Sequence, residues 1–481
     1  MFPKLAFTAL IAVAALGFWL KRRPLHPALI LLLASTFFSR IYWEVAGFTV
    51  RLEQLTSGLL FVFLALEVLR KRMKPRLDWR SGLMAGLFLM MVLSSLFASP
   101  FPSVSLQKTL VYFPYVLGFL ALAVFLEAKD RWLKAWDLFY GAGAAALAIS
   151  LIGFILFLFG INLGMVRVEW GSLWLRGTMV IPNILGSTAV VIFIIALVRS
   201  IWKRNETQGN RLDWIVLAIA TSCVMISFTR SAWIGSALGI IAVIALTVKK
   251  TSPGRLALAL AIIAATVGLT YLATTRIKPR FGDMPASASL GEFGEKEMDK
   301  YWVREETDEV EYAGKLKDLI GPDASREKPE EGRPENQHLS TIRHRWQIQK
   351  IALNDWRLSP LLGRGTDTLI LVNDNKPEFY ISSSCLTILH DWGILGAGLF
   401  AAFVLMTLGT LWKGLRRSED ASRQAAFSSL IVILVVWLLM DQVATTIQLS
   451  IFWVLSAFCS LAPPALSDKK KTESEATLSM R

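Results

Sequence analysis

Cysteine and charge are both scarce in this sequence. Only three cysteines occur among 481 residues, and no two of them form a CxxC pair. All three, Cys223, Cys385 and Cys459, lie in or beside apolar segments. Neither a zinc site nor a framework of disulfides is indicated, so redox chemistry can be set aside.

The small share of charged residues, 18%, contrasts with a large share of apolar ones, 54%. A soluble globular protein of this composition would have nowhere to bury much of its apolar surface. The sequence therefore predicts an all-α polytopic membrane protein, with about 13 transmembrane helices (12 to 14). The expected spans are 4–20, 27–43, 55–70, 81–98, 107–127, 135–162, 179–198, 213–228, 231–248, 256–275, 383–412, 425–444 and 447–464.

The formal net charge is +14, and the basic residues fall in short blocks between the apolar segments. If the N-terminus lies outside, alternation places every strongly basic short loop on one side, which the positive-inside rule makes cytoplasmic. The charge therefore sets orientation among membrane lipids, and a nucleic-acid partner is not expected. The blocks are 21–27, 70–76, 127–134, 199–211, 249–255, 413–423 and 469–471.

The same alternation places the longest polar stretch, residues 276–382, outside the membrane. Within it, residues 283–336 are densely charged and poor in aliphatic runs, which predicts an exposed, partly disordered tether. Residues 341–358 differ, because apolar side chains such as Ile348 and Ala352 recur with helical spacing. One large outer loop is therefore expected to contain an amphipathic helix.

These boundaries divide the chain into five parts. They are N-terminal transmembrane helices (1–169), transmembrane helices with the GTMVIPN and SFTRSAW motifs (170–275), the outer loop (276–382), C-terminal transmembrane helices (383–465) and a cytoplasmic tail (466–481).

Several cations lie on the outer side, where the positive-inside rule disfavours them. Arg230, in the middle of SFTRSAWIG, separates two apolar segments. Arg343, His344 and Arg345 begin the amphipathic helix, where positive charge opposes the helix dipole and does not stabilise the helix. Guanidinium and imidazole donors in such a cluster suit an oxyanion or a phosphate.

Four segments carry a resemblance to a known family. They are GTMVIPNILG (177–186), SFTRSAWIG (227–235), RWQIQKIALNDWRLSPLLGRG (345–365) and WGILGAG (392–398). In this order and spacing they resemble the bacterial O-antigen ligase and O-antigen polymerase family. The similarity spans roughly residues 170 to 400, and outside it only generic hydropathy remains.

The resemblance implies a metal-independent membrane glycosyltransferase in the bacterial inner (cytoplasmic) membrane, with its large loop in the periplasm. Such an enzyme takes a glycan from undecaprenyl diphosphate and passes it to a glycan or lipid acceptor, without a cofactor. Fixed cations would stabilise the charge that develops on the leaving diphosphate. The resemblance implies catalytic roles for Arg230 and Arg345, with His344 and Glu378 as further catalytic candidates. Expected substrate-binding residues are Arg176, Asn183, Arg343, Ser382 and Ser383.

One position departs from the family pattern. Many members carry a His-Asn pair where this chain has Ser382 and Ser383, and a serine cannot act as a general base unaided. His390 lies eight residues further on, about 12 Å deeper along a helix, and we interpret it as a buried, hydrogen-bonded residue. Candidate bases on the outer side are therefore His344, Glu378 and His338, and none of them has motif support.

Two other functional classes remain open on sequence grounds. A secondary transporter or lipid-linked glycan flippase would be expected to show two similar halves or broken helices with ion-coordinating groups. The sequence contains no such repeat. A non-catalytic assembly protein on the same fold is indicated only by the missing His-Asn pair. Ligase and polymerase differ in their acceptor, which the sequence does not display.

Overall fold

A computed structural model of the chain confirms the all-α polytopic membrane fold. The structure describes residues 25–45, 48–70, 79–126, 129–161, 163–169, 172–179, 182–202, 210–248, 251–281, 337–369, 371–373, 376–378, 381, 383–440 and 450–460. The expected span at 4–20 and the charged segment 283–336 lie outside these residues.

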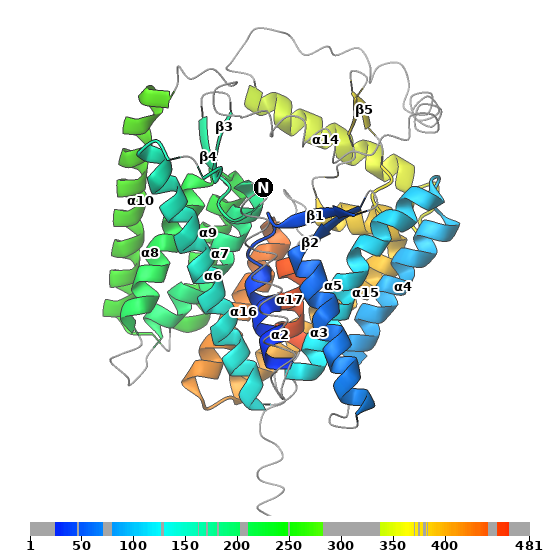
Figure 1. The fold of residues 1–481 in the computed structure, drawn as a ribbon, viewed down its shortest axis with the longest axis horizontal. Coiled ribbons are helices and arrows are strands. Elements are labelled where there is room, and N and C mark those ends of the chain that lie inside the picture. The colour runs from blue at the N-terminus through cyan, green and yellow to red at the C-terminus, as the bar shows by residue number, and fades with distance from the viewer. Residues whose placement is uncertain are drawn as a thin grey trace, which may run out of the picture.

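Helices dominate the described residues (Figure 1). Nine of those in the described part are long and apolar enough to cross a bilayer. The helices are α2 (Leu25–Ser35), α3 (Leu52–Leu69), α4 (Trp79–Phe97), α5 (Pro102–Leu126), α6 (Lys129–Leu158), α7 (Pro182–Ile201), α8 (Asn210–Ile226), α9 (Arg230–Thr247), α10 (Pro253–Phe281), α14 (Gln337–Trp356), α15 (Ser384–Arg417), α16 (Ala421–Met440) and α17 (Ser450–Ser460).

The expected span at 27–43 is wrong in its extent, because the helix over it, α2, ends at Ser35. Thr36 returns its side-chain hydroxyl to the carbonyl of Leu32 at 2.9 Å, and Phe37 donates its backbone N–H to Ala34. These bonds satisfy the last carbonyls of the helix and turn the chain. Arg40, which the expected span included, therefore lies in a loop beyond the helix end.

The described residues also form three short antiparallel hairpins, which were not predicted from the sequence. They are β1 (Tyr42–Val45) with β2 (Phe48–Arg51), β3 (Val166–Glu169) with β4 (Ser172–Leu175), and β5 (Leu371–Asn373) with β6 (Lys376–Glu378). Figure 1 shows them with α14 at one end of the helix bundle, which we call the loop end. Strands of three or four residues are too short to leave a clear alternation in the sequence.

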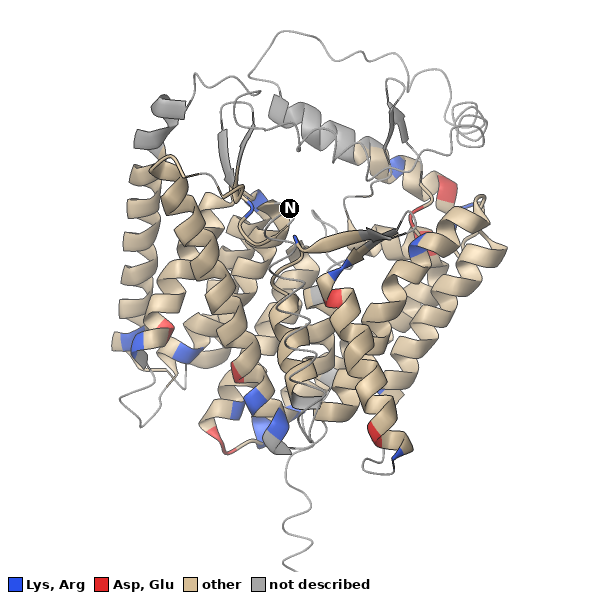
Figure 2. Ribbon diagram, in the orientation of Figure 1, with Lys and Arg blue, Asp and Glu red and all other residues tan. Residues whose placement is uncertain are grey.

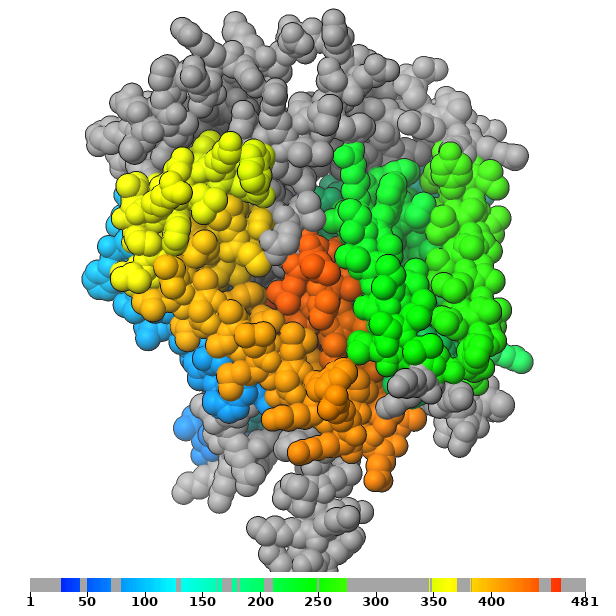
Figure 3. Space-filling model, turned by 180° about the vertical axis from the view of Figure 1, so that it is seen from behind, coloured from blue at the N-terminus to red at the C-terminus, as the bar shows by residue number. Residues whose placement is uncertain are grey.

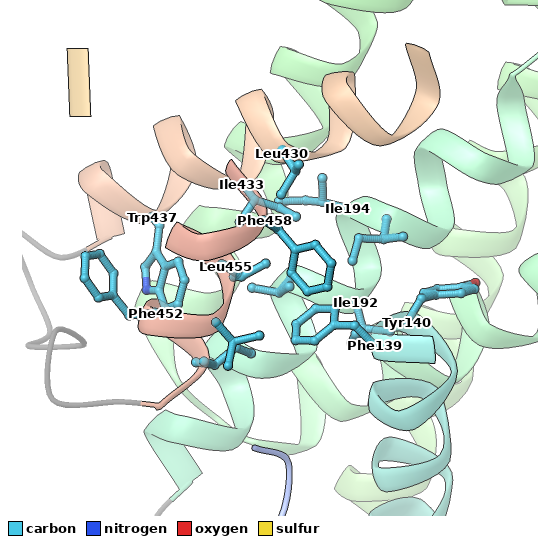
Figure 4. Close-up of a cluster of buried hydrophobic side chains, with 14 of the residues drawn as sticks. Phe139, Tyr140, Ile192, Ile194, Leu430, Ile433, Trp437, Phe452, Leu455 and Phe458 are labelled. Atoms are coloured by element: carbon cyan, nitrogen blue, oxygen red, sulfur yellow. The ribbon is translucent and has the colours of Figure 1, made fainter. Parts of the chain in front are cut away.

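The helices form two groups that meet at a shared core. In one group α7 packs against α8 and α9, and in the other α5 packs against α3 and α4, with α15 beside α4. The view from behind in Figure 3 shows α16 between the green helices of the first group and α15 of the second, in line with its packing against α9 and α15. Phe139, Trp437 and Phe458 belong to the aromatic cluster of this core (Figure 4). The core fixes how the loop ends of the two groups face each other.

The GSALG pattern in α9 serves helix packing, as its GxxxG spacing indicates. A Cβ added to Gly235 would overlap the Met440 side chain of α16, and one added to Gly239 would lie 3.1 Å from Ile194 of α7. Close approach on two sides of α9 therefore depends on these glycines.

In the described part of the chain, most charged residues lie near the two ends of the bundle (Figure 2). The end opposite α14, which we call the basic end, carries many of the described arginines. They are Arg70, Arg80, Arg131, Arg199, Arg211, Arg255, Arg416, Arg417 and Arg423, each near a helix terminus. The basic loops that alternation places on one side of the membrane adjoin these helix termini.

Candidate functional site

Arg230 is the first residue of α9, and its side chain is exposed at the loop end. The preceding turn contains Phe228 in the left-handed region, with a φ of 50°, and the helix begins after Thr229. The hydroxyl of Thr229 donates to Oδ1 of Asn183, in the first turn of α7, at 3.2 Å. Two residues expected from the sequence to bind substrate, Asn183 and Arg230, are thereby brought together.

The close approach of α7 to this turn has a steric basis. A Cβ added to Gly186 would lie 3.0 Å from Oγ of Ser227 and 3.0 Å from Cβ of Ala232. The small residues of GTMVIPNILG and SFTRSAWIG are therefore needed for the two motifs to meet. GTMVIPNILG and SFTRSAWIG therefore lie against each other at the loop end.

Arg176, between β4 and α7, is half-buried and donates its Nε–H to the carbonyl of Gly164 at 2.9 Å. Its backbone N–H donates to the carbonyl of Met165 at 2.9 Å, which continues the hairpin. Two residues further on, the backbone N–H of Thr178 donates to the hydroxyl oxygen of Ser150 at 3.2 Å. Arg176 is thus held at the base of the β3–β4 hairpin, on the chain segment that leads to Asn183.

The other expected site residues fall partly outside the described structure. Arg343, His344 and Arg345 lie in α14, and Glu378 ends β6, but their side chains are outside the described residues, as is Ser382. The approach of these side chains to Arg230 therefore stays a prediction.

Ser383 caps α15. Its side-chain oxygen accepts the backbone N–H of Leu386 at 3.4 Å, and the residue is buried. This is the ordinary function of a serine at a helix N-terminus.

His390 is fully buried and bound by carboxylates on both sides. Its Nδ1 lies 2.7 Å from Oδ1 of Asp391, and its Nε2 lies 2.9 Å from Oδ2 of Asp355, which also accepts Nε–H of Arg364 at 3.2 Å. An imidazole that donates from both nitrogens has no lone pair left to take a proton from a substrate hydroxyl. His390 is therefore the buried, hydrogen-bonded residue that the sequence indicated.

The turn SPLLGRG (359–365) follows α14 and packs against α15 where that helix is broken, at Gly393. Gly363 and Gly393 face each other there, with φ values of 79° and 66°. A Cβ on Gly363 would come within 2.5 Å of the Asp391 backbone, and a Cβ on Gly393 would overlap the Leu361 carbonyl. Arg364 donates its backbone N–H to the carbonyl of His390 at 2.8 Å. The glycines of PLLGRG and WGILGAG are thus required by backbone contact between the two motifs.

A row of hydroxyl groups continues from this turn into α4 and α5. Thr366 accepts from Thr109 at 2.7 Å, Thr109 also bonds to Ser95 at 2.7 Å, and Ser105 donates to Ser95 at 2.7 Å. The indole N–H of Trp392 donates to Thr366 at 3.2 Å. These buried partners were missed from the sequence, where two adjacent serines in an apolar helix, Ser94 and Ser95, were the available signal.

Glu53, in the first turn of α3, is a further buried carboxylate that sequence reasoning missed. It is fully buried; Tyr115 donates to its Oε1 at 3.5 Å, and its Oε2 has no hydrogen-bond partner in the described part of the chain. Its signal was an acidic residue immediately before an apolar run. No group of His, Cys, Asp or Glu among the described residues is arranged to hold a metal ion.

The comparison with family models gives one match over this region. Residues 215–401 match the model described as O-antigen ligase. The matched segment includes Arg230, Asp355 and His390, whereas Arg176 and Asn183 precede it. No match was found among curated proteins. Within this multi-pass membrane fold, residues 215–401 therefore form a domain similar to O-antigen ligases, in agreement with the resemblance of the sequence motifs.

Proposed function

We propose that the protein transfers a glycan from undecaprenyl diphosphate to a glycan or lipid acceptor at the loop end, on the outer face of the cytoplasmic membrane. The observation that carries this proposal is the placement of Arg230. Arg230 is an exposed residue at the N-terminus of a membrane helix, and it follows Thr229, whose hydroxyl donates to Asn183 in the first turn of α7.

This placement suits a leaving diphosphate. As the glycosidic bond breaks, negative charge collects on the phosphate oxygens, and fixed donors stabilise that charge without having to reorganise. The N-terminus of α9 adds the positive end of a helix dipole to the charge of Arg230. Arg176 and Asn183 supply further donors on the neighbouring segment, and we assign them to substrate binding.

The basic loops between the helices support the outer location. They adjoin helix termini at the basic end, where the positive-inside rule places the cytoplasm, and α14 lies at the opposite end. In this orientation α14 lies on the outer side, and Arg343 and Arg345 would bind the donor from there. We assign Arg345 as the second cation for the diphosphate.

Few side chains in the protein are suited to be the base that activates the acceptor hydroxyl. His390 is held by two carboxylates and Ser383 caps a helix, so neither is available for proton transfer. We assign the role to His344 or Glu378, and His338 is the next candidate on the same segment. The acceptor, which distinguishes ligase from polymerase, would be set by the groups around that base.

The test is transfer from an undecaprenyl-diphosphate-linked oligosaccharide by protein in vesicles, followed as donor consumed and product formed. Arg230→Ala and Arg345→Ala should each lower the rate about a hundredfold or more. Lysine at either position should rescue only part of the rate, because it keeps the charge and loses the planar two-pronged geometry.

Arg416→Ala is the matched control, because Arg416 stacks on Trp412 in the last turn of α15, at the basic end. Its rate should equal that of the parent protein. Parental transfer rates in Arg230→Ala at matched membrane expression would overturn the proposal.

A further inference from the structure

Two arginines from distant segments meet at Gly164, in the turn before β3. Arg176 donates its Nε–H to the Gly164 carbonyl at 2.9 Å. On the same residue, a Cβ would lie 2.9 Å from Nη2 of Arg40 and 3.8 Å from its Cζ. The Arg40 guanidinium therefore packs directly against the Gly164 backbone, and both guanidinium groups lie against one glycine.

Gly164 is suited to this arrangement in two ways. Its φ of 67° is a left-handed conformation that glycine adopts readily. It also has no side chain, and so leaves the space that the Arg40 guanidinium occupies. Any other residue at this position would push Arg40 away from Arg176.

The segments that carry the two arginines are bound to each other through their backbones. Arg40 donates its N–H to the carbonyl of Thr178 at 3.4 Å, and the hydroxyl of Thr178 donates to the carbonyl of Phe37 at 2.8 Å. Ser39 adds a contact from its hydroxyl to the sulfur of Met179 at 3.4 Å. The positions of Arg40 and Arg176 are thus fixed before any ligand binds.

Both side chains are half-buried, so part of each stays accessible at the loop end. Two guanidinium groups on one residue concentrate N–H donors and positive charge at one point. Such groups bind phosphate and carboxylate oxygens with charge-assisted, often bidentate hydrogen bonds. The segment from Arg176 leads directly into Asn183, whose side chain accepts from Thr229 beside Arg230. The arginine pair therefore lies on the chain segment that joins the site around Arg230.

We propose that Arg40 and Arg176 form a clamp for an oxyanion of the substrate, separate from Arg230. This inference rests on the proposed function. The oxyanion is a phosphate of the lipid diphosphate or the carboxylate of an acidic sugar, since both present paired oxygens to a guanidinium. Arg40 becomes a substrate-binding residue that lies outside the segment matched to the O-antigen ligase model.

The test measures ligand binding to full-length protein in phosphatidylcholine nanodiscs. The probes are undecaprenyl diphosphate, undecaprenol as its uncharged counterpart, and a disaccharide that contains glucuronate. Arg40→Gln and Arg176→Gln should each weaken binding of one charged probe about tenfold or more, since each removes a charge-assisted contact. Undecaprenol binding should not change.

Three further variants distinguish a specific loss of binding from a loss of folding. Arg40→Lys keeps the positive charge and should disturb the fold less than Arg40→Gln. It should bind the same probe with intermediate affinity. Gly164→Ala keeps every charge and places a methyl group 2.9 Å from Nη2 of Arg40, so it should weaken the same probe. Arg416→Gln, at the basic end, is the control and should bind like the parent protein.

Loss of undecaprenyl diphosphate binding assigns the clamp to the diphosphate, and loss of disaccharide binding alone assigns it to an acidic sugar. Parental affinity for both probes in Arg40→Gln and Arg176→Gln overturns the clamp, as does a parent protein that binds neither probe. Arg230→Ala, measured in parallel, separates the two hypotheses. If it loses diphosphate binding while the clamp variants keep parental affinity for both charged probes, the proposed function stands and the clamp falls.

Discussion

Asp355 and His390, 35 residues apart in sequence, are joined by a hydrogen bond of 2.9 Å between Oδ2 and Nε2. Asp355 lies near the end of α14, and His390 lies in the first two turns of α15. The bond therefore fixes the amphipathic helix of the large loop onto a membrane helix. With Asp391 and Arg364 it forms a buried charged group that stabilises the break in α15.

This arrangement predicts that His390 stabilises the protein and is not required for the chemistry. His390→Ala leaves Asp355 and Asp391 buried without their shared partner, a change that destabilises proteins by about 3 to 5 kcal/mol. The midpoint of thermal unfolding in detergent should fall clearly, while the transfer rate per folded molecule should fall only a few-fold. Cys385→Ala, at an exposed position on the same helix, is the control. A stable but inactive His390→Ala protein would show that the histidine acts on substrate.

The facing glycines predict a second, steric effect on stability. Gly393→Ala forces a methyl group into the backbone of Leu361 and requires a left-handed conformation, so it should destabilise the fold by more than about 2 kcal/mol. Gly363→Ala should act in the same way against the Asp391 backbone. Thermal unfolding of purified protein gives the measurement.

Gly398→Ala provides the matched control, because nothing lies within 4 Å of its added Cβ on the same helix. It should unfold at the parental temperature or slightly above it. Equal midpoints for Gly393→Ala and Gly398→Ala would contradict the packing of the SPLLGRG turn into α15.

The hydroxyl row from α5 to the loop predicts a contrast between two threonine substitutions. Thr109→Val removes the group that bonds both Ser95 and Thr366, and leaves two buried hydroxyls with a lost partner. Such a loss destabilises by about 1 to 3 kcal/mol. Thr407→Val, by contrast, breaks no hydrogen bond, because the buried Thr407 hydroxyl has no hydrogen-bond partner in the described structure.

The unfolding midpoint should therefore fall for Thr109→Val and stay level or rise for Thr407→Val. Both substitutions keep the side-chain shape, so packing is unchanged and only the hydroxyl differs. A higher midpoint for Thr109→Val than for Thr407→Val would mean that the row of hydroxyls does not hold the loop to the helices.

Hydropathy predicted the fold class well because each membrane helix carries its own signal. The segments at 81–98 and 425–444 reappear almost unchanged as α4 and α16. Small-residue spacing in α9 predicted close packing for the same reason, since it depends only on local sequence.

The bonds between distant segments could not be predicted from local sequence. Asp355, which binds His390, lies in α14, and Thr366, which binds Thr109, lies beyond α14. The two residues of each pair are too far apart in sequence to form a recognisable motif. Arg40 was hidden inside an expected span because Leu32 and Thr36 end the helix early through a side-chain bond. The motifs around Arg230 were recognised, since each is continuous in sequence, but their contact through Asn183 required the fold.

The last prediction concerns the side of the membrane on which the loop lies, since the proposed function requires the loop end to face outside. In a variant whose native cysteines are replaced, Lys300→Cys should react with an impermeant thiol reagent in intact cells. Asn205→Cys, in a basic loop, should react only after the membrane is permeabilised, because the positive-inside rule places that loop in the cytoplasm. Labelling of each position before and after permeabilisation gives the measurement, with the cysteine-free protein as the blank. The reverse pattern would place α14, Arg230 and the arginine pair at Gly164 in the cytoplasm, and the diphosphate donor would then have to be used on the inner face.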